Sequence, residues 1–191
     1  MNGQTPSRLR RCIRPVLRTL EHMLAVVGLM FLLYTFFFQI ARMTSSSMAP
    51  AMQGPERGAR PDWVLFEKFT YRFRQPRRWE IVRTRFRDGS LVAKRVVGLP
   101  GEEVSIRDGR ICINGVIQQP PPALAGLKYQ AAILLRPGRS ITCRANHVVV
   151  LGDDTRDSWD SRFEGDLDLN TVEGRALARV WPADRIGLLT P

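Results

Sequence analysis

The apolar positions of this chain follow two patterns, which change at about residue 42. Residues 23–41 form one uncharged run rich in Leu, Val and Phe. At about 1.5 Å per residue, a helix of this length is just sufficient to cross the hydrocarbon core of a bilayer. Beyond it the apolar runs are short and are separated by Gly, Pro and Asp, which is typical of an all-β domain. The sequence therefore predicts one N-terminal transmembrane helix followed by a mostly β, antiparallel domain.

The flanks of the apolar run predict how it is placed in a membrane. Residues 1–22 are rich in arginine and contain one acid, Glu21. Because basic residues favour the cytoplasmic side, we expect a cytoplasmic N-terminus and residues 42–191 outside the plasma membrane. A cleaved signal peptide usually has an apolar region of about 7–15 residues and a small-x-small cleavage site. Residues 39–43, QIARM, offer no such site, so an uncleaved anchor is favoured over a cleaved signal or a buried soluble helix.

Short apolar runs and turn residues alternate through the rest of the chain. The candidate strands are residues 63–66, 69–73, 81–84, 91–97, 104–106, 111–113, 148–151 and 177–181. Asp108-Gly109 and Asn114-Gly115 predict tight hairpins, because glycine accepts the positive φ that such turns require. Residues 118–126, QQPPPALAG, form an exposed loop, since proline has no amide hydrogen for a central ladder. We expect one catalytic β domain in which roughly residues 105–145 form a smaller inserted region.

Residues 69–73, FTYRF, alternate aromatic and polar side chains. This alternation predicts a strand whose aromatic face points to the core. The alternative is an aromatic edge of Phe69, Tyr71 and Phe73 at the lipid interface, where aromatic and arginine side chains are both favourable. The sequence leaves the interface role open.

Charge and cysteine content exclude some classes of function. The net charge is +11 and the sequence pI is about 10.9, but no basic helix or aromatic stacking platform accompanies the charge, so we expect no nucleic-acid partner. Cys12, Cys112 and Cys143 show neither a C-x-x-C pair nor metal-ligand spacing. We expect no metal and no cofactor. Outside the cytoplasm Cys112 and Cys143 could form a disulfide, and two ordinary thiols are an equal alternative.

A hydroxyl-rich segment, residues 45–50 (SSSMAP), follows the apolar run closely. Ser47 is a candidate nucleophile, although a serine hydroxyl requires a neighbouring base. An extended connection keeps Ser47 within roughly 20 Å of the end of the apolar run, so its chemistry would take place near the membrane surface. A polar linker next to the membrane is the alternative interpretation of this segment alone.

Lys94 is the candidate base. It lies in the run LVAKRVV, residues 91–97, where strand alternation turns either Lys94 or Arg95 inward. A solvated lysine with a pKa of about 10.4 is almost wholly protonated at pH 7, and burial disfavours the charged form. A pKa lowered to about 8 would leave about a tenth of the molecules neutral. Taken alone, a lysine in such a run is more often an edge residue that reaches water.

Three segments in this order resemble the type I signal peptidases, membrane-anchored Ser/Lys proteases that remove signal peptides from exported proteins. They are SSSMAP at residues 45–50, KRVVGLPG at 94–101 and GDDTRDSWDSR at 152–162. The resemblance implies a signal-peptidase-like antiparallel β catalytic domain in which Ser47 is the nucleophile and Lys94 the general base. It also implies substrates with small residues at the first and third positions before the cut.

The same resemblance implies supporting roles for four further groups. Ser45 matches a side-chain donor that stabilises the developing oxyanion together with the backbone amide of Ser47. Ser158 matches a serine that positions the base lysine, and Asp160 and Arg162 match a supporting ion pair.

The sequence contains residues of two other kinds of site. His147 could complete a Ser/His/Asp triad, but it precedes an apolar run and we expect a structural role; His22 flanks the anchor. A calcium loop from Asp153 to Glu164 has the right length, but Ser158 stands where the turn glycine belongs. Both observations favour the serine and lysine chemistry.

We therefore expect a single-pass membrane endopeptidase whose partners are signal-peptide-bearing precursors and the lipid bilayer, acting as a monomer. One alternative is a specialised relative that matures a pilin or conjugation protein, or an organelle's own signal peptidase. Another is a catalytically inactive, anchored β scaffold, against which labelling by a serine-reactive inhibitor would argue. A self-cleaving repressor-type protease lacks its N-terminal DNA-binding domain here, since the apolar run stands in that place.

Overall fold

The computed structural model of the protein describes residues 8–189, apart from the side chains of residues 8–12, 14 and 57. The chain divides into two compact units, Met1–Phe38 and Gln39–Pro191. Residues 1–7 of the predicted basic segment lie outside the described residues.

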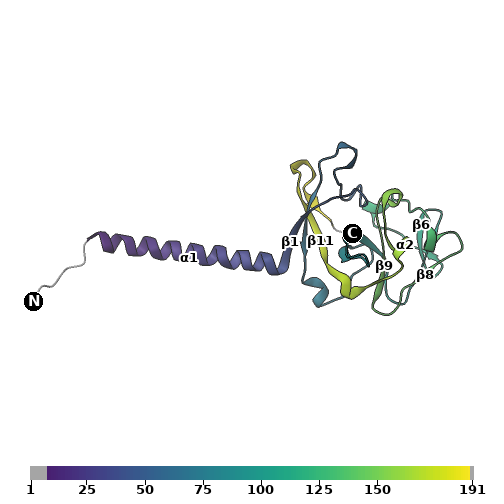
Figure 1. The fold of residues 1–191 in the computed structure, drawn as a ribbon, viewed down its shortest axis with the longest axis horizontal. Helices are drawn as coiled ribbons and strands as arrows, with labels where there is room; N and C mark the ends of the chain where they lie inside the picture. Colours follow the sequence, from purple (N-terminus) through teal and green to yellow (C-terminus); the bar gives the residue numbers. More distant parts are fainter. Residues whose placement is uncertain (1–7, 190–191) are drawn as a thin grey trace, which may run out of the picture. The chain divides into compact units, whose positions relative to one another are not determined.

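The first unit consists of the helix α1, Arg8–Phe37 (Figure 1). Its stretch Pro15–Phe37 is long and apolar enough to span a membrane. The helix begins and ends earlier than the predicted membrane-spanning run 23–41, whose own bounds stay a prediction. The helix begins earlier because the preceding segment is rich in arginine, a good helix former. It ends earlier because Phe38–Arg42 form strand β1, whose backbone groups pair with strand β2.

The second unit is built on two antiparallel sheets (Figure 1). The larger has the order β1-β2-β11-β3-β4-β9-β10, with β12 paired to β11. Its further strands are β2 Trp63–Glu67, β3 Ile81–Arg85, β4 Leu91–Gly98, β9 His147–Leu151, β10 Leu167–Asp168, β11 Val172–Trp181 and β12 Gly187–Leu188. The smaller, of order β7-β6-β5-β8, contains β5 Glu103–Arg107, β6 Arg110–Ile113, β7 Val116–Ile117 and β8 Ile141–Thr142. The mostly β fold class is confirmed.

Short helical turns connect the strands. They are η1 Glu56–Gly58, η2 Thr70–Arg72, η3 Pro122–Leu124, η4 Ile133–Leu135, η5 Thr155–Asp157, α2 Ser161–Glu164, η6 Leu169–Thr171 and η7 Ala183–Arg185. Both predicted hairpins are confirmed. Asp108-Gly109 joins β5 to β6 and Asn114-Gly115 joins β6 to β7, and all four of these residues have positive φ.

The run 69–73 is not a strand. The carboxylate of Glu67 accepts hydrogen bonds from the amides of Phe69 and Thr70 at 3.0 and 2.9 Å. These bonds compete with a sheet ladder and turn the backbone into η2. No residue of η2 is buried and the side chain of Phe73 is 85% exposed, so the prediction of a core-facing strand is wrong. The lipid-interface role of this segment stays a prediction.

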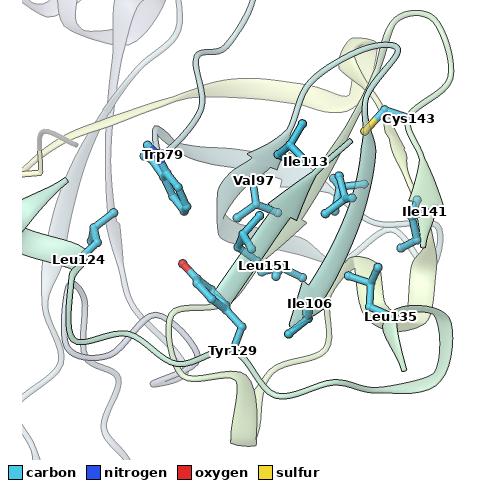
Figure 2. Close-up of a cluster of buried hydrophobic side chains, with 13 residues drawn as sticks. Trp79, Val97, Ile106, Ile113, Leu124, Tyr129, Leu135, Ile141, Cys143 and Leu151 are labelled. Atoms are coloured by element: carbon cyan, nitrogen blue, oxygen red, sulfur yellow. The ribbon is translucent and has the colours of Figure 1, made fainter. Parts of the chain in front are cut away.

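Three apolar clusters form the core of the second unit. One joins the smaller sheet to β9 and includes Trp79, Leu151 and Cys143 (Figure 2). A second packs Met48 and Met52 against β2, β3 and β11. The third lies under β3, β4 and β9. Cys112 and Cys143 are both buried free thiols, so the second of the two cysteine alternatives is the one observed.

Candidate active site

Ser47 lies in a turn that is fixed by apolar side chains of the core. Met48 and Met52 are 2% and 0% exposed, and the amide of Met52 donates to the carbonyl oxygen of Met48 at 2.8 Å. On the other side the amide of Asp154 donates to the carbonyl oxygen of Ser47 at 3.1 Å. The nucleophile candidate is therefore held by its backbone while its hydroxyl stays available.

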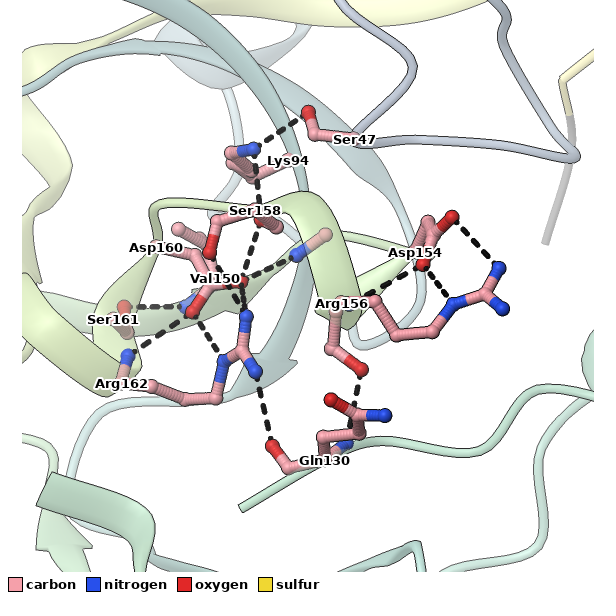
Figure 3. Close-up of polar contacts among 12 residues, drawn as sticks. Ser47, Lys94, Gln130, Val150, Asp154, Arg156, Ser158, Asp160, Ser161 and Arg162 are labelled. Atoms are coloured by element: carbon pink, nitrogen blue, oxygen red, sulfur yellow. Dashed lines mark hydrogen bonds and ion pairs between the residues drawn. The ribbon is translucent and has the colours of Figure 1, made fainter. Parts of the chain in front are cut away.

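Strand β4 places Lys94 against this hydroxyl (Figure 3). Lys94 Nζ lies 2.7 Å from Ser47 Oγ and 3.0 Å from Ser158 Oγ. The sequence predicts that either Lys94 or Arg95 faces inward. In the structure both are buried, with exposed fractions of 3% and 2%. Strand β4 is covered on both faces from Lys94 onward, which explains how neighbouring residues can both be buried.

Burial lowers the pKa of Lys94 to about 8. The charge of Asp160 raises this pKa and opposes the burial, whereas the charge of Arg162 lowers it further. At a pKa of about 8, about a tenth of the molecules carry a neutral amine at pH 7. Such an amine can accept the proton of the Ser47 hydroxyl.

A buried ion pair stands behind the lysine. Ser158 Oγ donates to Asp160 Oδ2 at 2.7 Å, and it accepts from Lys94. Asp160 receives Arg162 Nε at 2.8 Å and Nη2 at 3.0 Å, and it also receives the amide of Gly152 at 3.0 Å. The carboxylate is thus largely neutralised by arginine and reaches the lysine through a hydroxyl.

The short helix α2 fixes this ion pair. Asp160 is its N-cap residue and accepts from the amide of Arg162 at 3.1 Å. The next residue, Ser161, accepts from the amide of Val150 in β9 at 2.9 Å. The arginine also donates to the carbonyl oxygen of Gln130 at 3.0 Å, so the inserted region contributes to the support.

Gly152 is a residue whose role the sequence did not reveal. A Cβ atom at this position would lie 2.3 Å from Ser158 Oγ and 2.5 Å from the carbonyl oxygen of Ser47. Real Cβ atoms do not approach other atoms so closely. Only glycine lets the Ser47 turn and the Ser158 hydroxyl come together. The one indication in the sequence was that this glycine belongs to the GDD segment that resembles the family.

Ser45 completes the group. Its hydroxyl is exposed and donates to Ser47 Oγ at 3.2 Å. The amide of Ser47 donates to no acceptor within the described part of the chain. The Ser45 hydroxyl and the Ser47 amide are thus two donors close to the nucleophile candidate, and a pair of donors is what a developing oxyanion requires.

The chain is similar in sequence to known proteins. Residues 16–181 match the family model described as signal peptidase, peptidase S26. The chain belongs to the signal peptidase family. It is 34% identical to a signal peptidase I of Leptolyngbya laminosa, over 82% of this chain and 75% of that protein. It is 33% identical to the probable signal peptidase I-2 of Synechocystis sp., over 82% of this chain and 69% of that protein.

A solved signal peptidase I from Enterococcus faecalis V583 shares 32% identity with the chain, covering 53% of this chain and 97% of the other, with a TM-score of 0.45. Family membership makes the protein a peptidase, a hydrolase of peptide bonds.

Two cavities of this peptidase meet at Ser47 and Lys94. The first, of about 190 Å³, lies between residues 41–45 and the start of β4, and includes Arg83. The second, of about 340 Å³, extends toward Phe86 and Trp159. A peptide lying across the serine could therefore place one part of its chain in each cavity.

The residues of the two alternative sites, the histidine triad and the calcium loop, make other contacts. His147 Nδ1 contacts the carbonyl oxygen of Ala145 at 2.9 Å. Asp153 binds Arg95, and Glu164 accepts a hydrogen bond from the Trp159 indole at 2.7 Å. Over residues 8–189 no group of three or more His, Cys, Asp or Glu side chains is arranged to hold a metal.

Proposed function

We propose that this serine endopeptidase removes signal peptides from precursor proteins with Ser47 as the nucleophile and Lys94 as the general base. The observation that carries the assignment is the 2.7 Å separation between Lys94 Nζ and Ser47 Oγ. It is supported by the lowered pKa of the lysine, which makes neutral amine available near pH 7.

Acylation follows from the positions of these groups. Neutral Lys94 accepts the hydroxyl proton while Ser47 Oγ bonds to the scissile carbonyl carbon. The oxygen of the tetrahedral intermediate receives hydrogen bonds from the Ser47 amide and the Ser45 hydroxyl. When the carbon–nitrogen bond breaks, Lys94 returns the proton to the leaving amine. An ester between the signal peptide and Ser47 remains.

Deacylation uses the same base. Lys94 removes a proton from water as the water oxygen attacks the ester carbon, and then returns the proton to Ser47 Oγ. Ser158 holds the amine between the two serine hydroxyls. Asp160 orients Ser158, and Arg162 offsets the charge of Asp160. We assign no metal, cofactor or nucleic acid to the reaction.

We further propose that α1 anchors the peptidase in the plasma membrane as a single pass, with residues 1–22 cytoplasmic and the β domain from residue 42 outside. The apolar stretch Pro15–Phe37 and the arginines before it support this arrangement. We expect a monomer. Protease treatment of sealed vesicles tests the orientation, because only right-side-out vesicles should expose the β domain.

The experiment that tests the chemistry uses the full chain in detergent with a precursor that has small residues at the first and third positions before the cut. Ser47→Ala, Lys94→Ala and Lys94→Arg should each abolish cleavage while circular dichroism shows an intact fold. Ser105→Ala, in the smaller sheet, is the matched serine control and should cleave normally.

Two outcomes would contradict the proposal. Undiminished cleavage by Ser47→Ala would refute the nucleophile. Absence of cleavage by the unmodified chain across many precursors would favour a specialised peptidase. If a serine-reactive acylating inhibitor also failed to label Ser47, an inactive scaffold would be favoured instead.

A further inference from the structure

The first cavity contains an arginine that the proposed chemistry does not use. Arg83 lies in β3, where its backbone pairs with Ala93, the residue before Lys94. It follows Ile81 by two positions, so the two side chains share a sheet face. That face carries the Met48 core cluster, to which Ile81 and the neighbouring Ala93 belong.

The guanidinium of Arg83 is partly buried and has one ring contact and one long ion pair. Its side chain is 12% exposed and its Cζ lies 5.8 Å from the centre of the Phe66 ring. Its one carboxylate neighbour, Glu173, is 3.8 Å from Nε and is held at 2.6 Å by Arg85. The side chain of Arg83 donates no hydrogen bond to any residue that the structure describes. The cavity therefore contains a partly desolvated cation whose N–H groups can still donate hydrogen bonds.

The rest of the cavity wall contains no negatively charged side chain that could pair with Arg83. Arg42 and Lys94 also line it, and none of the described lining residues carries a carboxylate. A side chain entering the cavity meets positive charge in a partly water-excluded space, where charge-assisted hydrogen bonds are strong. Such a space favours an acceptor and disfavours a second cation.

The length of the cavity indicates which substrate residue meets Arg83. Its wall follows β4 from Lys94 back to Leu91, about 10 Å at 3.3 Å per residue. An extended substrate covers that distance with three residues, and its first and third side chains before the cut point the same way. The first lies nearest Ser47 and Lys94, and the third lies two residues farther along the wall, about level with Val92. Arg83, paired with Ala93, is one residue from that point.

We propose that Arg83 is a specificity-determining residue that binds a hydrogen-bond acceptor, a hydroxyl or a carboxylate, on the third side chain before the cut. This inference rests on the proposed function. It adds to the general requirement for small side chains a preference for short polar ones over apolar ones of equal size, and a rejection of lysine.

Matched pairs of substrates test the preference. A precursor peptide with alanine at the first position is prepared with Ala, Val, Thr, Asn, Asp or Lys at the third. Val and Thr have the same shape, and so have Asn and Asp. For the unmodified enzyme we expect kcat/KM to be roughly tenfold higher for Thr than for Val, a typical effect of a hydrogen bond to a charged group. Asp should exceed Asn, and Lys should be the poorest substrate.

Variants separate recognition from structure. Arg83→Leu should reverse the order of Thr and Val and remove the advantage of Asp. Arg110→Leu, which removes an exposed arginine of the smaller sheet, is the control and should leave both ratios unchanged. Glu173→Gln keeps Arg83 intact and removes its competing carboxylate, so the ratio of Asp to Asn should rise.

The outcomes are distinct. Unchanged ratios in Arg83→Leu, with the alanine peptide still cleaved, overturn this inference and leave the proposed function standing. If Arg83→Leu does not fold, an Asp to Asn ratio that fails to rise in Glu173→Gln overturns it. Failure of the unmodified enzyme to cleave the alanine peptide overturns the proposed function itself, and this inference with it.

Discussion

Lys94 and Arg95 are neighbours in β4, both are buried, and their surroundings are opposite in kind. Arg95 donates to both carboxylate oxygens of Asp153 at 2.7 and 2.6 Å and to the carbonyl oxygen of Trp79 at 2.7 Å. Lys94 contacts the hydroxyls of Ser47 and Ser158. One cation has a full counter-charge, and the other has neutral partners.

The difference explains why Lys94, and not Arg95, is the proposed base. A paired carboxylate would keep Lys94 protonated, whereas neutral hydroxyls leave burial as the dominant influence on its pKa. The nearest candidate counter-charge, Asp160, is already bound by Arg162. The site therefore depends on Arg162, which pairs with Asp160 and prevents that carboxylate from pairing with Lys94.

The largest expected effect comes from removing the unpaired cation. Lys94→Met should lower kcat/KM by at least about ten thousandfold, because nucleophile and base act as a unit. Its thermal midpoint below pH 8 should equal or exceed that of the unmodified protein. The unfolded lysine keeps a pKa of about 10.4, so at pH values below the lowered pKa the native state carries the full cost of burying the charge. A lower midpoint at pH 7 would contradict the comparison.

Removing the paired cation should have the opposite outcome. Arg95→Met leaves Asp153 buried and unpaired, and should lower the free energy of unfolding by about 3–5 kcal/mol. Thermal or urea unfolding of the full chain measures the loss. The double variant Arg95→Met/Asp153→Leu removes both charges and should recover most of it. A single variant as stable as the unmodified protein would show that the pair is not a structural one.

Removing the Ser158 hydroxyl, which contacts Lys94, should have an intermediate effect on activity. Ser158→Ala removes the 3.0 Å contact to Lys94 Nζ and should lower kcat roughly tenfold to hundredfold, the range of a hydrogen bond to a charged group. Ser158→Thr keeps a hydroxyl and should retain more activity than the alanine variant. Equal activity of Ser158→Ala and the unmodified enzyme would remove Ser158 from the site.

The smallest effect should be a shift in pH dependence. The kcat/KM of the unmodified enzyme should rise with pH through about 8, because the neutral amine is the base. Asp160 raises the pKa of Lys94, so Asp160→Asn should move this rise to lower pH. Since about a tenth of the amine is already neutral at pH 7, the gain there is at most about tenfold.

Asp157→Asn is the matched control for this shift. Asp157 is exposed and raises the pKa of Lys94 less than Asp160 does, so its removal should move the rise less. Movement of the Asp160→Asn profile to higher pH would contradict the assignment of Lys94 as the base.

The strands could be predicted from the sequence where burial alone determines them. The run 91–97 is apolar around two charges, and β4 occupies it with one residue added. The run 69–73 has the same alternation as a strand, but Glu67 captures two amides and turns the chain. Periodicity reports which side chains could share a face, and it does not report a competing side chain nearby.

The site residues that belong to a motif could be predicted from the sequence. Those whose role depends on close approaches between distant segments could not. Ser47, Lys94 and Ser158 lie together as expected from the resemblance. The need for glycine at position 152 depends on the approach of two distant segments, which no local pattern encodes. The position of Arg83 in the first cavity depends on strand register, which a single sequence does not give.

The contacts of the base join distant parts of the chain. Lys94 meets Ser47 across 47 residues and Ser158 across 64 residues of sequence. Such non-local contacts form after their connecting segments have closed. A nascent chain in which residue 158 is not yet in place lacks the contact that holds the proposed base. With Lys94 as the proposed base, proteolytic activity would begin only at the end of folding, when the enzyme's own loops are no longer open to attack.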